Sequence, residues 1–173
     1  MATSYGEIPF GLRDVKLTPL PSGTGADLPR VRSVEVSLTS DNTELTGDDT
    51  TVAVRVFNLR VEGSIEAGGI NPAAVAIMVG GTVTSTGSTP NAKKTIAIGS
   101  ATNAGYFKLE GQVIADDGGD FHILVYKAKV TTGPTWTFTG GEFTLTTADF
   151  TGVADDDDKI IDLVWNETAT AVA

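Results

Sequence analysis

The sequence predicts a mainly β protein that forms one domain. Its 173 residues include 25 Thr and 17 Val, whose branched Cβ atoms favour a pleated sheet over a helix. Apolar residues make up 40% of the chain and charged residues 20%, the composition of a globular protein rather than of a disordered one. A chain of this length can bury a single sizeable core. We therefore expect residues 1–173 to fold as one domain.

The first strands are predicted from apolar alternation and from the breaks between them. A short strand over 11–20 runs into a segment rich in Pro and Gly, which cannot continue a sheet. Residues 31–38 then alternate between apolar and polar side chains, the period of a strand with one buried face. The apolar set is Val34, Val36 and Leu38, and the polar set is Ser33, Glu35 and Ser37.

A long strand over 51–67 is expected after a polar segment. Val52, Val54 and Val56 continue the even-numbered apolar face, but beyond them the apolar residues are odd-numbered. Either a bulge at Val56–Phe57 turns the strand, or the strand passes from one sheet to another. The preceding segment, 39–49, holds one Leu and four acidic residues, so we expect it to be poorly ordered in a free subunit.

One short helix is predicted over 72–79. Asn71 suits the N-cap, Pro72 suits the first helical position, and Gly80 follows the last turn. No residue of this helix is charged, so we expect it to be covered on all sides, partly by a neighbouring subunit. The residues proposed for that interface are Ala73, Ala74, Ala76 and Ile77.

The second half of the chain predicts further antiparallel strands. They are a hairpin over 82–86 and 95–98, a strand over 106–115, a turn at 116–120, a central strand over 121–130 and a last strand over 159–165. Gly140-Gly141 is interpreted as a two-residue hairpin loop. This loop would place Phe138 opposite Phe143 and Trp136 opposite Leu145.

Residues that could carry chemistry are few. The chain has no Cys and a single His, His122, and it contains no phosphate-binding, zinc-protease or serine-hydrolase motif. We therefore expect no catalytic residue, no metal site and no cofactor, and we interpret His122, which lies within a strand, as structural. Two acidic clusters, 116–120 and 155–158, lack the spacing of a calcium loop and are interpreted as solvated turns.

The net charge of -10 disfavours binding to nucleic acid or to anionic lipid. The N-terminus lacks the basic and apolar regions of a signal peptide, so we expect a protein that is made and used without export.

Several segments resemble the major tail tube proteins of long-tailed, non-contractile phages, the siphoviruses. They are Tyr5-Gly6, 11–20, 44–49, 59–70, 106–112, 116–120, 126–129 and 140–143. The likeness extends over nearly the whole chain. Its specificity comes from the number and order of the segments, because none of them is a catalytic signature.

The resemblance implies a β-sandwich or barrel-like subunit with one short helix. Six such subunits would form a ring, and stacked rings would form the tube that conducts phage DNA into the host. Four strands from each subunit give a 24-stranded barrel about 115 Å in circumference and roughly 37 to 45 Å in diameter. The implied partners are other copies of this chain, the tape measure protein, and the tail tip and tail terminator proteins. Double-stranded DNA would pass without specific binding. This chain would bind no membrane, and it would reside in the virion after assembly in the host cytoplasm.

Three regions are assigned within that framework: an N-terminal arm over about 1–10, an inter-ring loop over about 39–50 and a C-terminal arm over about 166–173. The inter-ring loop contributes Asp41, Glu44, Leu45, Asp48 and Asp49. The residues proposed to face the lumen are Ser33, Glu35, Ser37, Thr51, Ala53 and Arg55. Glu35 and Arg55 are expected to pair.

Other classes of function stay open. A ligand- or carbohydrate-binding β-sandwich needs exposed aromatic residues on one face, whereas the five Trp and Tyr residues fall mostly in alternating core patterns. A jelly-roll hydrolase needs two carboxylates at a defined spacing, and no pair stands out. A secretion-system tube of related fold is a further alternative. An acidic wall suits a DNA conduit because a basic wall would hold phosphate, but the same charge also keeps an ordinary β protein in solution.

Overall fold

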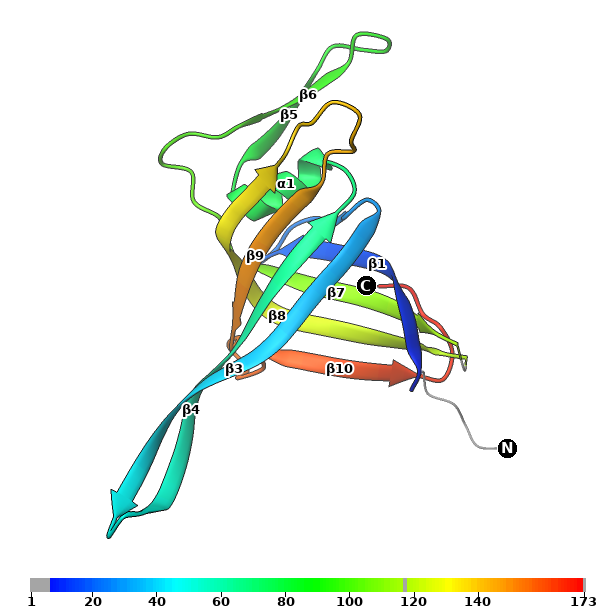
Figure 1. Cartoon of the computed structure of the whole chain (residues 1–173). Helices are drawn as coiled ribbons and strands as arrows, with labels where there is room; N and C mark the ends of the chain where they lie inside the picture. Colours follow the sequence, from blue (N-terminus) through cyan, green and yellow to red (C-terminus); the bar gives the residue numbers. More distant parts are fainter. Residues whose placement is uncertain (1–6, 117, 173) are drawn as a thin grey trace.

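The computed structural model describes residues 7–116 and 118–172 (Figure 1). These residues form ten strands and one helix, so the chain is mainly β as the sequence predicts. The elements are β1 (Pro9–Pro19), β2 (Ala26–Asp27), β3 (Val31–Gly47), β4 (Thr50–Ala67), α1 (Pro72–Val79), β5 (Thr82–Thr86), β6 (Lys93–Ala97), β7 (Phe107–Ala115), β8 (Asp120–Trp136), β9 (Thr146–Val153) and β10 (Ile161–Asn166). Most of the expected N-terminal arm, including Tyr5 and Gly6, lies outside the described residues, as do Asp117 and Ala173.

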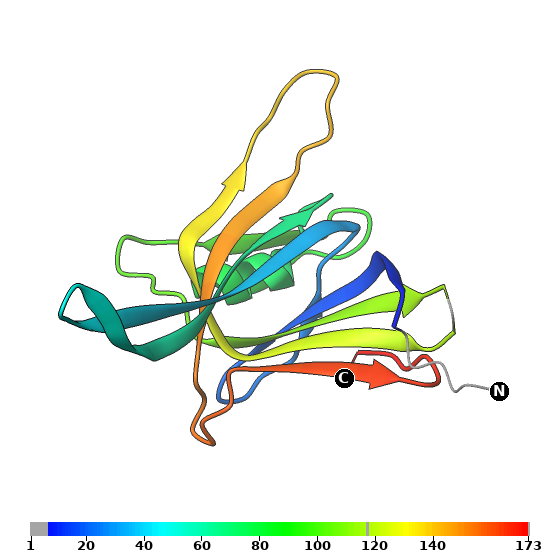
Figure 2. The ribbon, with the colours of Figure 1, turned by 60° about the horizontal axis from the view of Figure 1, so that its bottom comes forward.

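The long strand β8 joins two antiparallel layers. Its first half pairs with β7 and β10, and from Lys127 onward it pairs with β9. One layer therefore has the order β2-β1-β7-β8-β10 and the other has the order β8-β9-β4-β3. Figures 1 and 2 show that the strands of the two layers cross steeply and that β8 bends from one layer into the other. This arrangement is the β-sandwich or barrel-like fold that the resemblance implies.

The core lies between the two layers. Its fully buried side chains include Val15, Leu17, Phe107, Leu109, Val125, Val61 and Phe150. Gly63 on β4 pairs with Phe150 on β9. A Cβ at Gly63 would lie 2.6 Å from Cζ of Phe150 and 2.3 Å from the backbone oxygen of Glu35. Glycine is therefore required where the aromatic ring reaches across β4.

Helix α1 has the ends that its sequence predicts. The Asn71 side chain accepts a hydrogen bond from the backbone N–H of Ala73 at 3.0 Å, and Gly80 ends the helix with φ 79°. The helix packs on β8 and β1, and the β5–β6 hairpin contacts it as well. Much of the expected cover therefore comes from the chain itself. Ala74 is 1% exposed in this chain's own core, so its assignment to a subunit interface is wrong.

The connection between β8 and β9 differs from the predicted two-residue loop. Trp136 pairs with Thr146 rather than with Leu145, and residues 137–145 form a projecting loop (Figure 2). Two register shifts between Val130 and Thr135 disturb the end of β8, around a proline that cannot donate to the ladder. As a result Phe138 and Phe143 do not face each other across a hairpin but are exposed in the loop.

The β3–β4 hairpin extends well beyond the rest of the fold (Figure 1). β9 covers β4 only from Val61 to Ala67, so beyond Arg60 the two strands continue alone. The expected bulge is present but lies slightly later, at Asn58 (φ 54°), between the Thr39–Arg60 and Asp41–Phe57 pairs.

Two expectations about this hairpin are corrected by the structure. The polar segment 39–50 is paired strand with a tight turn, not an irregular loop. The expected continuation of the apolar core face is exposed, because no second layer covers the extension. The exposed residues are Val52, Val54 and Val56 on the extension and Leu38 at the end of the four-stranded layer.

Candidate functional site: a polar sheet face and a projecting hairpin

The outer face of the β8-β9-β4-β3 layer is polar. The register places Glu35 beside Ser64 on β4, and Ser64 beside Asp149 on β9. Side chains that are neighbours across strands share a face, and their alternates point the other way. The alternates Ile65 and Ala148 are buried in the core. The polar side chains therefore face away from the core as a set.

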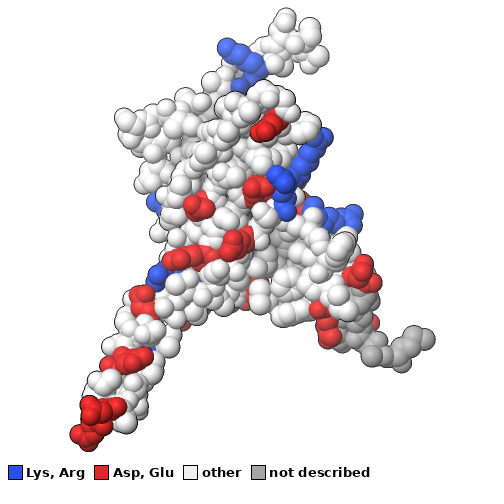
Figure 3. All heavy atoms as spheres, in the orientation of Figure 1, with Lys and Arg blue, Asp and Glu red and all other residues white. Residues whose placement is uncertain are grey.

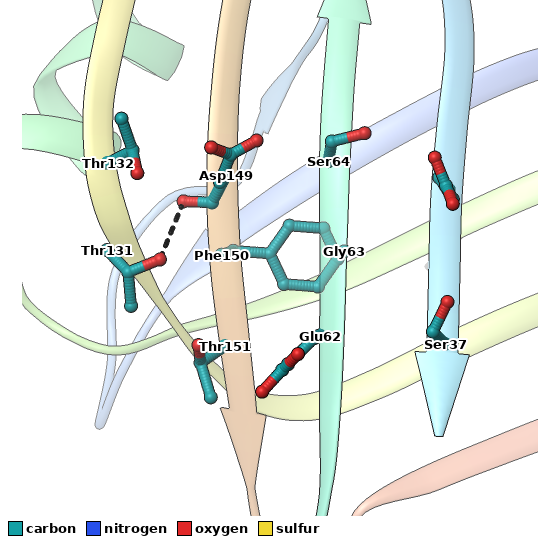
Figure 4. Close-up of a pocket in the computed structure, with 10 residues that line it drawn as sticks. Ser37, Glu62, Gly63, Ser64, Thr131, Thr132, Asp149, Phe150 and Thr151 are labelled. Carbon is teal, nitrogen blue, oxygen red and sulfur yellow. Dashed lines mark hydrogen bonds between the residues drawn. The ribbon is translucent and has the colours of Figure 1, made fainter. Parts of the chain in front are cut away.

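A hollow of about 610 Å³ lies at the centre of this face. Figure 4 shows hydroxyl and carboxylate side chains from β8, β9, β4 and β3 around it, with the Thr131 hydroxyl donating to the backbone oxygen of Asp149 at 3.4 Å. Its lining includes Glu35, Ser37, Glu62, Ser64, Asp149 and Thr151, and no lining residue is Lys, Arg or His. Such a surface holds water and repels phosphate. Within 7–116 and 118–172, no group of His, Asp or Glu side chains is placed to hold a metal ion.

Arg60 lies where the hairpin leaves the sheet, and its guanidinium group forms ion pairs with two carboxylates. Its Nε contacts Glu62 at 2.8 Å and its Nη1 contacts Asp41 at 3.3 Å. The hydrogen bonds to Glu62 and Asp41 raise the pKa of Arg60. A hydrogen bond from Asn58, followed by one from Arg60, lowers the pKa of Asp41. Figure 3 shows mostly acidic side chains on the surface where the hairpin leaves the sheet.

The structure divides the residues proposed for the lumen into two groups. Ser33, Glu35 and Ser37 lie on the polar face of the four-stranded layer, whereas Thr51, Ala53 and Arg55 lie on the two-stranded extension. Arg55 pairs with Thr43, eight positions along β3 from Glu35, which corresponds to about 25 Å. The expected Glu35–Arg55 pair is therefore wrong.

Other polar residues of this face were not predicted from the sequence. Glu62 and Ser64 lie near the buried Val61 and Ile65 on the same strand. Extending the odd-numbered apolar pattern beyond Val61 to Ile65 would have assigned these two polar residues to the opposite, exposed face. Asp149 and Thr151 lie on β9, a strand that was not predicted from the sequence.

Both edges of the four-stranded layer are free in the described chain. β3 pairs only with β4, and beyond Ala128 β8 pairs only with β9. Each neighbouring pair in the order β8-β9-β4-β3 is antiparallel, so the two edge strands run in opposite directions. Long free edges expose unpaired backbone groups and normally require a cover or a partner.

The hairpin extension is both acidic and apolar. Asp41, Glu44, Asp48 and Asp49 are exposed on it, and Figure 3 shows acidic side chains to its tip. Large apolar side chains are exposed on the same extension, namely Leu45, Val52, Val54, Val56, Phe57 and Leu59. A two-stranded ribbon has little stability alone in water, and exposed apolar residues on such a ribbon are typical of a surface that a partner covers.

A second polar cluster is buried beneath the C-terminal segment. Asp120 is 0% exposed, so the interpretation of the whole 116–120 cluster as a solvated turn is wrong at this residue. It accepts hydrogen bonds from Gln112, Asn166 and His122 and from the backbone N–H of Thr170. Burial alone would raise its pKa, but these bonds outweigh burial and lower the pKa to about 2. His122 lies inside this network.

The other acidic cluster is a turn held by its own hydrogen bonds and by an ion pair, from Lys127 Nζ to Asp156 at 3.1 Å. The Asp155 side chain accepts hydrogen bonds from the backbone N–H groups of Asp157 and Lys159, both at 2.9 Å. Asp156, Asp157 and Asp158 are exposed, in line with a solvated turn.

The exposed aromatic side chains among residues 7–116 and 118–172 do not form one face. Trp165 on β10 is 48% exposed, although its strand pattern suggested a core position. The others are Phe10 on β1, Phe57 on β4, Tyr106 before β7, and Phe138 and Phe143 in the β8–β9 loop. Their scatter does not make the aromatic platform that a carbohydrate-binding sandwich needs.

The described residues contain no helix long and apolar enough to cross a membrane. No protein-family model matches the sequence, and no curated protein matches it. Among solved structures, the chain is similar to a protein in the tail of an empty GTA particle with C6 symmetry. The match covers 88% of this chain and 94% of that chain, at 12% sequence identity and a TM-score of 0.49.

Proposed function

We propose that this protein is the subunit of a phage tail tube and that its β8-β9-β4-β3 layer lines the channel. The observation that carries the proposal is a four-stranded antiparallel layer with a polar outer face and two free edges. The core-facing side of the same layer is buried against the other layer. The polar face is thus left for water or for whatever passes along it.

The free edges allow copies of the chain to join into a closed ring. In a ring every copy has the same orientation, so β3 of one copy meets β8 of the next. These strands run in opposite directions because the layer has an even number of antiparallel strands. Edge-to-edge contact therefore extends the antiparallel order and removes both free edges. Six copies make a 24-stranded barrel about 115 Å in circumference.

The hollow at the centre of the polar face has the chemistry of a wall that does not hold phosphate. A wall that contacts phosphate through Lys or Arg gains affinity at each contact by releasing counterions. The hollow on this face has no basic lining residue, and Arg60 beside it is engaged by Glu62 and Asp41. Double-stranded DNA is therefore expected to pass without specific binding.

The remaining parts of the chain are assigned to contacts between subunits. The projecting hairpin, with Asp41, Glu44, Leu45, Asp48 and Asp49, is proposed to join successive rings. On α1, the side chains of Ala73, Ala76 and Ile77 are not fully buried and are proposed to touch a neighbour within the ring. The terminal arms, 1–10 and 166–173, are proposed to take part in assembly. The proposed setting is a siphovirus virion, with the tape measure, tail tip and tail terminator proteins as partners and assembly in the host cytoplasm.

Electron microscopy of the purified protein at high concentration tests the assembly. The expected result is six-fold rings or tubes with a central hole. A protein that stays monomeric at every concentration, ionic strength and pH tried would contradict the proposal.

Charge reversal on the polar face tests conduction. Glu35→Lys combined with Ser37→Lys should leave tubes intact but slow or trap DNA ejection, because the new cations hold phosphate. The matched control, Ser85→Lys with Asp157→Lys, adds the same charge at exposed positions outside this face. Equal ejection rates in both particles would rule out the face as the channel wall.

A further inference from the structure

We propose that the tip of the β3–β4 hairpin docks into a cleft at the opposite end of the same layer in a second copy of this chain. The hairpin tip comprises residues 44–52. The end cleft is lined by Arg30, Arg32, Gly69, Glu142, Phe143 and Leu145. This inference rests on the function proposed above and identifies the surface that receives the hairpin.

The hairpin tip reaches far beyond its own chain. The four-stranded layer ends near the Thr39–Arg60 pair, and β3 continues from there to Gly47. Eight residues of extended strand span about 25 Å. At the tip Leu45 is 64% exposed and Val52 is 66% exposed. Nothing in the described part of the chain covers them, so their cover must come from another molecule.

The end cleft lies at the other end of the layer, where β3 begins, β4 ends and the β8–β9 loop projects (Figures 1 and 2). Its volume is about 850 Å³, within the range in which proteins enclose whole small ligands. It can therefore admit the side chains of one tight turn. Phe143 is 92% exposed at this cleft. A large aromatic side chain is more stable when it is buried, so its exposure is typical of a contact surface.

The charges of the hairpin tip and the end cleft are opposite. The turn of the tip presents Asp48 and Asp49, and Glu44 precedes them. The cleft contains two arginines and one acidic residue, Glu142. Arg32 contacts Glu66 at 3.1 Å with 61% of its side chain exposed. No ion pair to Arg30 occurs among the described residues, so its charge is available for a partner.

Both surfaces also carry apolar side chains, Leu45 and Val52 on the tip and Phe143 and Leu145 in the cleft. The two surfaces lie at opposite ends of one layer, so their contact is head to tail and repeats from copy to copy. Repetition along the strand direction stacks rings rather than closing them. The β5–β6 hairpin also carries two lysines, Lys93 and Lys94. Neither lines the end cleft, so this hairpin provides the control.

The test measures the critical concentration for tube growth by light scattering, with electron microscopy of the products. Arg30→Glu should raise that concentration about tenfold or more and leave rings in place of tubes. Asp48→Asn with Asp49→Asn should also raise it, while asparagine still tolerates the left-handed turn at φ 51° and 63°. In that background, where Glu44 is the one acidic residue left on the tip, Arg30→Glu should have much less further effect, because most of the repulsion it creates is gone. The control, Lys93→Glu with Lys94→Glu, should form tubes like the parent.

The outcomes separate this inference from the proposed function. If the parent forms tubes and Arg30→Glu forms the same tubes, the cleft is not the receiving surface. The same conclusion holds if Lys93→Glu with Lys94→Glu abolishes tubes instead, or if the Arg30 and tip changes act independently. If the parent forms neither rings nor tubes, the proposed function itself fails. If Arg30→Glu does not melt like the parent, Phe143→Ser takes its place, because it changes only an exposed side chain of the cleft. Phe143→Ser should likewise leave rings without tubes.

Discussion

Replacing Asp120 with asparagine should destabilise the subunit and remove a pH-dependent part of its stability. The Asp120 carboxylate accepts hydrogen bonds from Gln112 at 2.6 Å, Asn166 at 2.8 Å, His122 at 2.9 Å and the backbone N–H of Thr170 at 2.8 Å. It thereby ties β7, β8 and the end of β10 to the C-terminal segment. An asparagine amide brings two donors into a site that already has four. We expect a loss of about 2–4 kcal/mol at pH 7.

The pH dependence follows from the lowered pKa of Asp120. Its pKa is about 2 in the folded chain and about 3.9 in the unfolded chain. The difference corresponds to about 2.5 kcal/mol of stability. Because the folded pKa is the lower one, this contribution is complete above about pH 5. It declines progressively as the pH falls through the unfolded and then the folded pKa, and it is absent by about pH 1.

Urea unfolding of the dilute subunit, followed by tryptophan fluorescence, measures both effects. Other carboxylates titrate in the same range, and Glu110 lies 3.4 Å from the other ring nitrogen of His122. The informative quantity is therefore the difference in unfolding free energy between parent and Asp120→Asn at each pH. This difference should shrink steadily from pH 5 to pH 2.5. Asp157→Asn, in an exposed turn, is the control and should show no such difference.

The C-terminal segment supplies a second measurement. Since Thr170 is held by Asp120, proteases should cleave the segment faster in Asp120→Asn than in the parent. A stability difference that is the same at pH 3 and pH 7, or one below about 0.5 kcal/mol throughout, would refute the reasoning.

Three further outcomes are expected. Gly63→Val should lower the melting temperature by many degrees or prevent folding, because a Cβ there collides with Phe150; a melting scan near that of the parent would contradict the packing described. Ala73→Glu, at the exposed start of α1, should leave circular dichroism and melting nearly normal while rings disappear, and normal rings would show that the helix faces solvent. Ala74→Glu, at a buried position, should instead destabilise the subunit itself by several kcal/mol. Backbone amides of residues 41–57 should exchange hydrogen quickly in the subunit and slowly in tubes, because an isolated two-stranded ribbon is marginally stable; equal protection in both states would contradict an inter-ring role.

Local patterns in the sequence were sufficient for most of the elements. The alternation at 31–38, the change of phase near Val56 and the capping residues Asn71 and Gly80 each act over a few residues. Such signals specify a strand, a bulge or a helix end without reference to the rest of the fold. The mainly β class could likewise be predicted from composition.

Burial was decided by the tertiary structure instead. Val52, Val54 and Val56 alternate like a core strand, yet they are exposed because β9 ends at Val153 and leaves the hairpin uncovered. Asp120 belongs to an acidic turn by sequence, yet it is buried because donors from residues 112, 166 and 170 converge on it. The end cleft brings Arg30 and Phe143 together from segments more than a hundred residues apart. Alternation specifies which side chains share a face of a strand, but whether that face is covered depends on the distant segments packed against it.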